Sequence, residues 1–177
     1  MIRAARPGDE NGIARVHVQS WRSTYRGIVP DEVLDGLSEE TGARRWKTVL
    51  ESQDSREFVF VAESCPGESG EIVGFAVGGP ERDGDPVYKG ELYAIYLLNT
   101  HQRQGLGSRL VHAVAAELIR RGLDSMLVWV LVDNPACRFY EALGGRRLRS
   151  RPITIGPATL EEVAYGWPDL KASGFTG

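Results

Sequence analysis

The sequence provides little of the chemistry that depends on cysteine and histidine. Its two cysteines, Cys65 and Cys137, cannot build a disulfide framework or a Cys-x-x-Cys pair for zinc or redox chemistry. The histidines His17, His101 and His112 share no metal-ligand spacing, so we expect no metal. No apolar run is long enough for a signal peptide or a membrane span, which predicts a cytoplasmic protein without a membrane partner.

Charge is nearly balanced, which argues against nucleic acid as a partner. The 177 residues include 21 Lys or Arg and 24 Asp or Glu, for a net charge of −3. Residues 101–151, however, contain nine Arg and only four acidic residues. This segment either binds an anionic ligand or forms a solvated basic face. The length fits one domain over residues 1–177, with a tail from Lys171 that we expect to fray.

Apolar residues in the first half of the chain recur first at helical and then at strand spacing. Glycine and proline residues separate these segments. The pattern predicts a strand at 2–5, a helix at 9–25, a helical region at 31–51 interrupted near Gly36, and an antiparallel hairpin of strands 58–62 and 72–77. A polar loop is expected from Gly78 to Gly90.

The second half of the chain alternates strands and helices, so the predicted fold class is mixed α/β. Residues 92–98 and 126–132 are almost entirely apolar, as in strands that are covered on both faces. Apolar residues four apart from Leu106 to Leu118 predict a helix that ends at Gly122. The remaining predicted elements are a helix at 135–143 and closing strands at 146–149 and 160–167.

A glycine turn joins the strand at 92–98 to the helix that follows it. The turn is Gln102-Arg103-Gln104-Gly105-Leu106-Gly107-Ser108. A helix N-terminus presents unpaired backbone N–H groups and a partial positive charge, and glycine lets a phosphate approach them closely. The turn therefore predicts a phosphate or pyrophosphate that is held largely by main-chain atoms.

Three alternatives compete with this interpretation of the turn. A nucleotide P-loop needs a lysine after its second glycine, and no lysine occurs between Lys89 and Lys171. A Rossmann fingerprint needs a third glycine, and this chain has Leu110 in that place. Gly105 and Gly107 are also compatible with close packing of the helix on the strand and no ligand.

Two segments on either side of the strand at 126–132 resemble the motifs of one family. Glu91-Leu92-Tyr93-Ala94-Ile95-Tyr96-Leu97 followed by Gln102-x-x-Gly105-x-Gly107 looks like the signature of the GNAT superfamily of acetyl-CoA-dependent N-acetyltransferases. Asn134-Pro135-Ala136-Cys137-Arg138-Phe139-Tyr140-Glu141-Ala142-Leu143-Gly144-Gly145 is similar to the second motif of that family. The resemblance implies a mixed, mostly antiparallel sheet that is flanked by helices and splayed between its fourth and fifth strands.

The resemblance also implies a coenzyme A site. Backbone N–H groups of the glycine turn would hold the pyrophosphate, and the pantetheine arm would lie between the two splayed strands, with the N–H of Leu97 facing the thioester oxygen. The implied cofactor-binding residues are Ile95, Tyr96, Leu97, Gln102, Arg103, Gln104, Gly105, Leu106, Gly107, Ser108, Asn134 and Tyr140. Asn134 fits an N-cap of the following helix equally well. Relatives often have proline at the position of Asn99. This difference affects the expected geometry of the loop after the strand and not the coenzyme site.

Acetyl transfer needs a neutral amine and a proton for the departing thiolate. By the resemblance, Tyr140 would donate that proton and Glu91 would act as the general base. The alternatives are a core tyrosine and a surface carboxylate, and His101 and Asp133 are further candidates for the base. Cys137 has no histidine near it in sequence, so we expect direct transfer in a ternary complex and no acyl-enzyme.

The resemblance thus predicts an enzyme that moves the acetyl group of acetyl-CoA to a primary amine of a small molecule or peptide. It places Trp21 and Tyr25 in the acceptor site, although both also fit core aromatics. The acidic loop Glu81–Asp85 suggests a cationic amine. Two alternatives stay open, a sensor that binds acyl-CoA without turnover and a nucleotide-binding protein. Relatives are often dimers, so a homodimer is also open.

Overall fold

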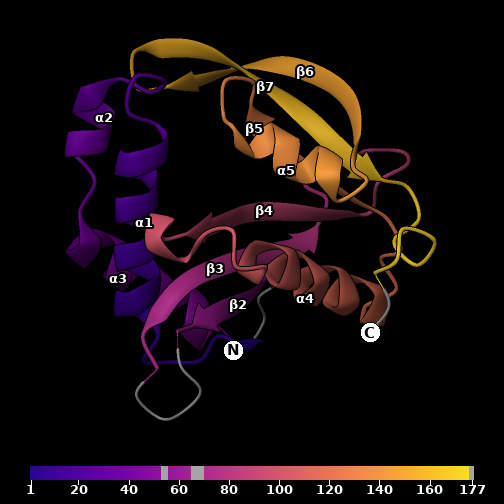
Figure 1. Ribbon diagram of the computed structural model, residues 1–177, viewed down its shortest axis with the longest axis horizontal. Coiled ribbons are helices and arrows are strands. Elements are labelled where there is room, and N and C mark those ends of the chain that lie inside the picture. Colours follow the sequence, from indigo (N-terminus) through magenta and orange to yellow (C-terminus); the bar gives the residue numbers. More distant parts are fainter. Residues whose placement is uncertain (53–55, 65–69, 176–177) are drawn as a thin grey trace.

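The computed structural model of the protein describes residues 1–52, 56–64 and 70–175, and Cys65 lies outside these ranges. Over these residues, one mixed sheet has the strand order β1-β2-β3-β4-β5-β7-β6 (Figure 1). The strands are β1 (Ile2–Ala4), β2 (Phe58–Glu63), β3 (Ile72–Pro80), β4 (Gly90–Leu97), β5 (Met126–Leu131), β6 (Arg146–Ile155) and β7 (Ala158–Trp167). Only β4 and β5 pair in parallel among the described strands. The predicted fold class, with its mostly antiparallel sheet, is confirmed.

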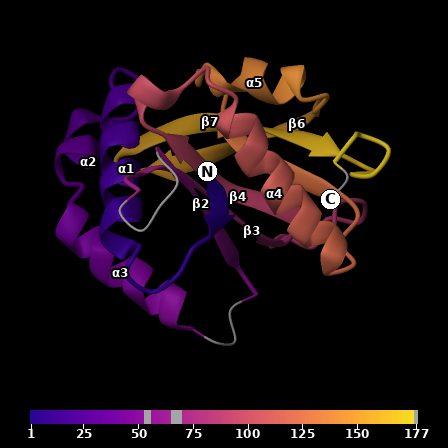
Figure 2. The same cartoon turned by 60° about the horizontal axis from the view of Figure 1, so that its bottom comes forward.

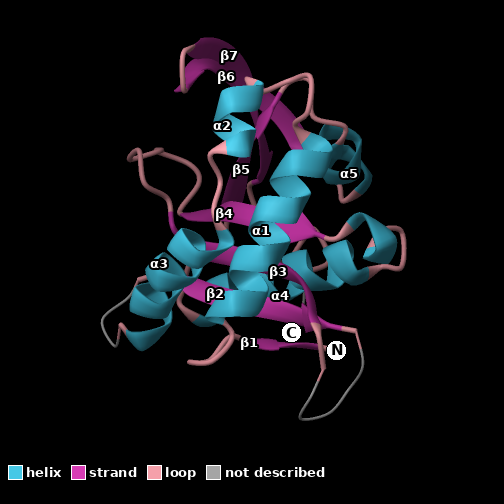
Figure 3. Ribbon diagram, turned by 90° about the vertical axis from the view of Figure 1, so that its left-hand side faces the viewer, coloured by secondary structure: helices cyan, strands magenta, loops and turns pink. Residues whose placement is uncertain are grey.

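Helices cover both faces of the sheet (Figures 2 and 3). One face carries α1 (Glu10–Thr24), α2 (Asp31–Asp35) and α3 (Glu39–Glu51), and the other carries α4 (Leu106–Arg120) and α5 (Ala136–Ala142). Successive side chains of a strand point to opposite faces, so neighbouring residues belong to different cores. Phe75 and Val77 of β3 pack in the core of α1 with Ile13, whereas Ala76 packs in the core of α4 with Leu110.

An irregularity in β4 opens the sheet. The pairing between β3 and β4 skips Tyr93, so β4 carries one residue more than β3 at this point. Such a bulge bends its strand and increases the local twist. β4 pairs with β5 only over Gly90–Leu92, although β4 continues to Leu97. The two parallel strands are therefore separate beyond the bulge, as the resemblance implied.

Several predicted boundaries of the strands are wrong. β3 extends to Pro80, so the loop before β4 is shorter than predicted. β6 runs to Ile155 and does not end at Arg149, and β7 begins at Ala158. β6 is an edge strand whose side chains are mostly exposed and include several arginines, so the apolar alternation that marks a strand is missing there.

The expected fraying from Lys171 is also wrong for the described part of the tail. Leu170 is fully buried, and Phe175 is only 2% exposed. The Phe175 ring packs on the rings of Trp167 and His112, at centroid distances of 5.9 and 4.8 Å. Its N–H donates to the Leu170 carbonyl at 3.0 Å. One aromatic side chain thus holds a segment whose glycine and serine content suggested a loose end.

Replacement of this aromatic side chain tests the packed tail. Phe175→Ala removes a buried ring and leaves a cavity, so we expect the free energy of unfolding to fall by about 3 kcal/mol. Urea denaturation followed by circular dichroism measures the change. Lys171→Ala, at an exposed position of the same segment, is the matched control and should change stability by less than about 0.5 kcal/mol. Equal stability of the Phe175 variant and the unaltered protein would contradict the packed tail.

Candidate active site

A cavity of about 800 Å³ lies where β4 and β5 separate. Its walls include Tyr93–Leu97 of β4 and Val128–Leu131 of β5, together with parts of α1, α5, β6 and β7. Val130 belongs to the core of α4 and α5, whereas Leu131 belongs to the core that contains Tyr25. Side chains from both faces of the sheet therefore line one cavity, which passes between the two strands.

The glycine turn borders this cavity, where a short 3-10 helix, η1 (Asn99–His101), leads into α4. Gly105 is the N-cap of α4 and has a φ of 76°. Arg103, with a φ of 58°, is the only described non-glycine residue with a positive φ. None of the backbone N–H groups from Arg103 to Ser108 donates to an acceptor among the described residues. Free N–H groups arranged in this way at a helix N-terminus form an anion-binding concavity.

The two glycines of the turn are required for different reasons. A Cβ atom on Gly105 would meet no atom within 4 Å, so only the left-handed backbone requires glycine there. A Cβ atom on Gly107 would lie 3.3 Å from side-chain atoms of Leu97 and Phe139. Close packing thus explains Gly107, whereas Gly105 shapes the anion-binding turn.

Buried tyrosines and one amide meet in the cavity. Asn134 donates from Nδ2 to the Tyr25 hydroxyl at 3.1 Å, and its Oδ1 accepts from the N–H of Ala136 at 2.9 Å. Asn134 therefore holds the start of α5 and also reaches the cavity wall. Burial raises the pKa of Tyr140, Tyr25 and Tyr96 above the ordinary value for tyrosine. Each phenol consequently keeps its proton at neutral pH and can donate it.

An aromatic cluster along α1 supports the same wall. The His17 ring stacks on Tyr96 of β4, with centroids 5.3 Å apart and planes 19° apart. Trp21 packs edge-on against Tyr25 at 4.9 Å, and both residues line the cavity. Burial, with a smaller effect of the Arg45 charge, lowers the pKa of His17 to about 4. The His17 ring is therefore neutral at physiological pH.

The chain is similar in sequence to known N-acetyltransferases. An FR47-like family model matches residues 86–152, which contain the glycine turn and α5. The chain is 42% identical over 171 residues to the uncharacterized N-acetyltransferase YuaI of Bacillus subtilis, and this match covers 97% of the chain and 94% of YuaI. The chain belongs to the GNAT superfamily of N-acetyltransferases. The resemblance that the motifs indicated is confirmed.

Solved GNAT structures share this fold. The PaiA N-acetyltransferase of Thermoplasma acidophilum, in complex with coenzyme A, aligns with a TM-score of 0.73 at 19% identity and covers 94% of this chain and 96% of its own. The yncA protein of Salmonella typhimurium, with its cofactor acetyl-CoA, aligns with a TM-score of 0.67 at 21% identity, over 94% of this chain and 92% of its own. At these identities the likeness supports the GNAT fold.

Most of the predicted site residues line the one cavity. These residues are Trp21, Tyr25, Ile95, Tyr96, Leu97, Gln102, Arg103, Gly105, Gly107, Ser108, Asn134 and Tyr140. Gln104 and Leu106 do not line it, since the Gln104 amide donates to the Thr100 carbonyl at 3.2 Å and Leu106 is buried in the core of α4. Their backbone N–H groups are nevertheless part of the anion-binding turn.

Of the two predicted catalytic residues, Tyr140 lines the cavity and Glu91 does not. Its side chain is buried, and its carboxylate accepts from Nη2 of Arg82 at 2.5 Å and from Nε at 3.1 Å. The Arg82 guanidinium lies over the Tyr93 ring at 4.2 Å. Glu91 thus ties the loop before β4 to the strand. His101 and Asp133, the other candidates for the base, do not line the cavity either.

Trp129 of β5 and Glu162 of β7 are among the cavity-wall residues that the sequence alone does not single out. Trp129 is part of an apolar strand, where an aromatic residue is ordinary. Glu162 is a buried carboxylate, 7% exposed, within a strand that was assigned only a closing role. A charged residue inside an otherwise buried stretch was the one local signal available.

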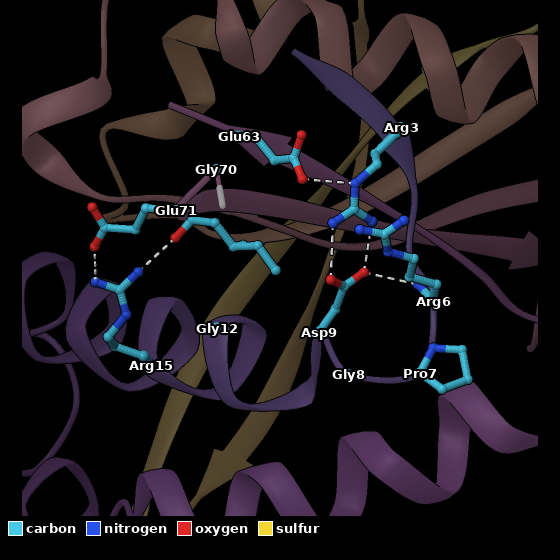
Figure 4. Close-up of a pocket in the computed structure, with 11 residues that line it drawn as sticks. Arg3, Arg6, Pro7, Gly8, Asp9, Gly12, Arg15, Glu63, Gly70 and Glu71 are labelled. Carbon is cyan, nitrogen blue, oxygen red and sulfur yellow. Dashed lines mark hydrogen bonds and ion pairs between the residues drawn. The ribbon is translucent and has the colours of Figure 1, made fainter. Parts of the chain in front are cut away.

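A second hollow, of about 660 Å³, lies at the start of α1 (Figure 4). Most of its charged side chains pair with one another. Arg3 binds Asp9 at 2.7 Å and Glu63 at 2.8 Å, and Arg15 binds Glu71. None of the predicted site residues lines this hollow. Arg6 also lines the hollow, so three arginines and three carboxylates balance there and the lining has no net charge.

Residues 1–52, 56–64 and 70–175 contain neither a cluster of metal-ligating side chains nor a membrane-spanning helix. No group of three or more His, Cys, Asp or Glu side chains there could hold a metal ion. Within the same ranges, no helix has the length and apolar character needed to cross a membrane.

His17 provides a pH-dependent test of the aromatic cluster. Its folded pKa of about 4 lies below the ordinary 6.5, so the unfolded chain takes up the proton first as pH falls. The contribution of neutral His17 to stability is complete above about pH 6.5 and is lost towards pH 4. We expect the His17 ring to stay neutral at about pH 5.5 in an NMR titration.

The variant His17→Gln gives the matching measurement of stability. Between about pH 7 and pH 5 the unaltered protein should lose about 2 kcal/mol more of its free energy of unfolding than the variant, because only the former must keep a neutral imidazole buried. A His17 ring that titrates near its ordinary pKa, or equal losses in the two proteins, would show that His17 is not held in the cluster.

Proposed function

We propose that the protein transfers the acetyl group of acetyl-CoA to a primary amine of a small molecule or peptide, directly in a ternary complex. The observation that carries this proposal is the cavity between β4 and β5, which has an anion-binding turn at its border and buried tyrosines in its wall. Its walls come from both faces of the sheet. A donor and an acceptor can therefore approach from opposite sides and meet between the strands.

The residues present fit coenzyme A. The N–H groups of Arg103–Ser108 would hold its pyrophosphate, because they have no acceptor among the described residues. The part of β4 beyond Leu92 is not paired with β5, so its backbone groups on that side are available to the amides of the pantetheine arm. Acetyl-CoA supplies the acetyl group and a thiolate leaving group. The N–H of Leu97 is proposed to face the thioester oxygen.

Tyr140 is proposed as the proton donor to the departing thiolate. Burial raises its pKa, so the phenol is protonated throughout the neutral range. The phenol lines the cavity, and Asn134 and Tyr25 line the same wall. A protonated phenol in the cavity wall can supply the proton that the departing thiolate takes up.

Direct transfer is supported by the surroundings of Cys137. Burial raises the pKa of its thiol, which therefore stays protonated and weakly nucleophilic. Its Sγ donates to the carbonyls of Leu131 and Val132 at 3.6 and 3.7 Å. Cys137 does not line the cavity, so no acyl-enzyme is proposed.

The role of Glu91 as general base stays a prediction. The pairing with Arg82 occupies both of its carboxylate oxygens, so the side chain would have to leave Arg82 before it could take a proton from an amine. Within the present arrangement, Glu91 acts by holding the loop before β4 against the strand that carries the bulge.

Calorimetric titration with acetyl-CoA tests the coenzyme site. We expect one molecule to bind per chain, and Gly105→Ala to weaken that binding by at least about 10-fold, because a Cβ disfavours the left-handed backbone of the turn. Gly122→Ala is the matched control. Gly122 has a similar φ of 80°, and a Cβ atom on it would likewise meet no atom within 4 Å, but it lies beyond the other end of α4.

Both glycine variants should lose about 1 kcal/mol of stability, and only the Gly105 variant should lose affinity for acetyl-CoA. NAD and ATP serve as competitors in the same titration. Absence of acetyl-CoA binding, or competition by NAD or ATP at the same site, would contradict the proposal and favour packing or nucleotide binding as the role of the turn.

Tyr140→Phe tests turnover separately from binding. With a primary amine found by screening for thiol release, we expect kcat to fall by about 100-fold or more, while the affinity for acetyl-CoA stays within about 2-fold. Tyr88→Phe, a buried tyrosine outside the cavity, is the control and should keep full activity. Acetyl-CoA binding without thiol release for any amine would favour the sensor, and an unchanged kcat would remove Tyr140 from the mechanism.

A further inference from the structure

Glu162 is the only acidic side chain among the described residues that lines the cavity. It lies on β7, opposite Leu131 of β5 and Arg151 of β6. Its neighbour Val163 packs in the core of α4 and α5. Because side chains alternate along a strand, Glu162 faces the other side of the sheet, that of α1 and α2. The carboxylate is therefore on the side of the cavity opposite to α4.

The partners of Glu162 leave part of its carboxylate unused. Arg151 donates from Nε to Oε1 at 2.6 Å, and no other described residue donates to this carboxylate. The same guanidinium binds Asp83 at 2.6 Å and lies over the Trp129 ring at 3.8 Å. A carboxylate has room for about four hydrogen bonds, and a buried one with a single donor can accept a further cationic donor.

The acidic loop before β4 sets the charge at this end of the cavity. Asp83 and Asp85 of that loop bind Arg151 and Arg149 of β6, each at 2.6 Å. With Glu162, three carboxylates face two guanidinium groups, which leaves one negative charge. The acidic sequence of this loop favours a cationic amine as the acetyl acceptor. In the structure its aspartates compensate the arginines, and Glu162 is the carboxylate that reaches the cavity.

We propose that Glu162 is the anionic anchor of the acetyl acceptor and binds the ammonium group of an amine with an apolar body. This inference rests on the proposed function of the cavity. Trp129, Ile153 and Ile155 line the wall beside Glu162 and provide an apolar surface for the rest of the molecule. Charge pairing is stronger in such a wall than in water, so the anchor selects cationic acceptors over neutral ones of the same shape.

A pair of ligands of similar shape tests the anchor. Benzylamine is cationic at neutral pH and benzyl alcohol is neutral, and both can be titrated into the coenzyme A-loaded protein with tryptophan fluorescence as the signal, since Trp21 and Trp129 line the cavity. We expect the unaltered protein to bind benzylamine at least about 10-fold more tightly than benzyl alcohol. Glu162→Gln should abolish this preference and leave the affinity for benzyl alcohol unchanged.

Glu161→Gln is the matched control, because Glu161 is the neighbouring residue of β7 and is exposed. It should keep the full preference for benzylamine. Glu162→Asp provides a second variant, which keeps the charge but shortens the side chain and should keep only part of the preference. The preference of the unaltered protein is measured without any substitution, so a poorly folded variant does not prevent the test.

Two results would show that Glu162 does not anchor the acceptor. One is equal affinity of the unaltered protein for the two ligands, and the other is an undiminished preference for benzylamine in Glu162→Gln. Titration of the same samples with acetyl-CoA separates this inference from the proposed function. If acetyl-CoA binds and the preference is absent, only the role of Glu162 is wrong. If acetyl-CoA does not bind, the proposed function is wrong as well.

Discussion

The pairing of β4 with β5 ends at Leu92, and the whole candidate site depends on this ending. The extra residue Tyr93 bends β4 at that point, so two parallel strands that begin as neighbours continue apart. The separation exposes backbone groups of β4 and joins the two faces of the sheet through one cavity. The glycine turn follows β4 after the short helix η1, which places its free N–H groups beside the opening.

Some charged residues near the cavity form ion pairs that hold the fold together, and others can still bind a ligand. Arg82 forms an ion pair with Glu91, and the arginines of β6 form ion pairs with the aspartates of the loop before β4. These pairs fasten the loop to the sheet on both of its sides. The polar side chains that line the cavity include buried phenols, whose pKa burial raises, and one partly satisfied carboxylate, Glu162. Among the described residues, the cavity wall therefore combines phenolic proton donors with a single acidic side chain.

The sequence best predicts the features that depend on residues close together along the chain. The glycine turn and the segment around Tyr140 are predictable because the residues of each motif lie within a few positions of one another. The core strands are predictable because their apolar runs are continuous. Contacts between distant segments could not be predicted in this way. The pairing of Glu91 with Arg82, the position of Glu162 opposite Leu131, and the packing of Phe175 on Trp167 all depend on how the folded strands meet. The sequence predicts too short an edge strand β6 for a related reason. Its exposed arginines interrupt the apolar alternation that marks a strand.

We propose that one opening between β4 and β5, with the turn beside it, receives coenzyme A. Hydrogen–deuterium exchange with and without acetyl-CoA tests it most directly. We expect slower exchange of the backbone amides at 94–97 and 103–108, because the strand edge and the turn gain acceptors, and no change in α3 (Glu39–Glu51). Binding of acetyl-CoA without protection of these two segments, or with protection at the hollow near Arg3 and Arg15, would contradict it.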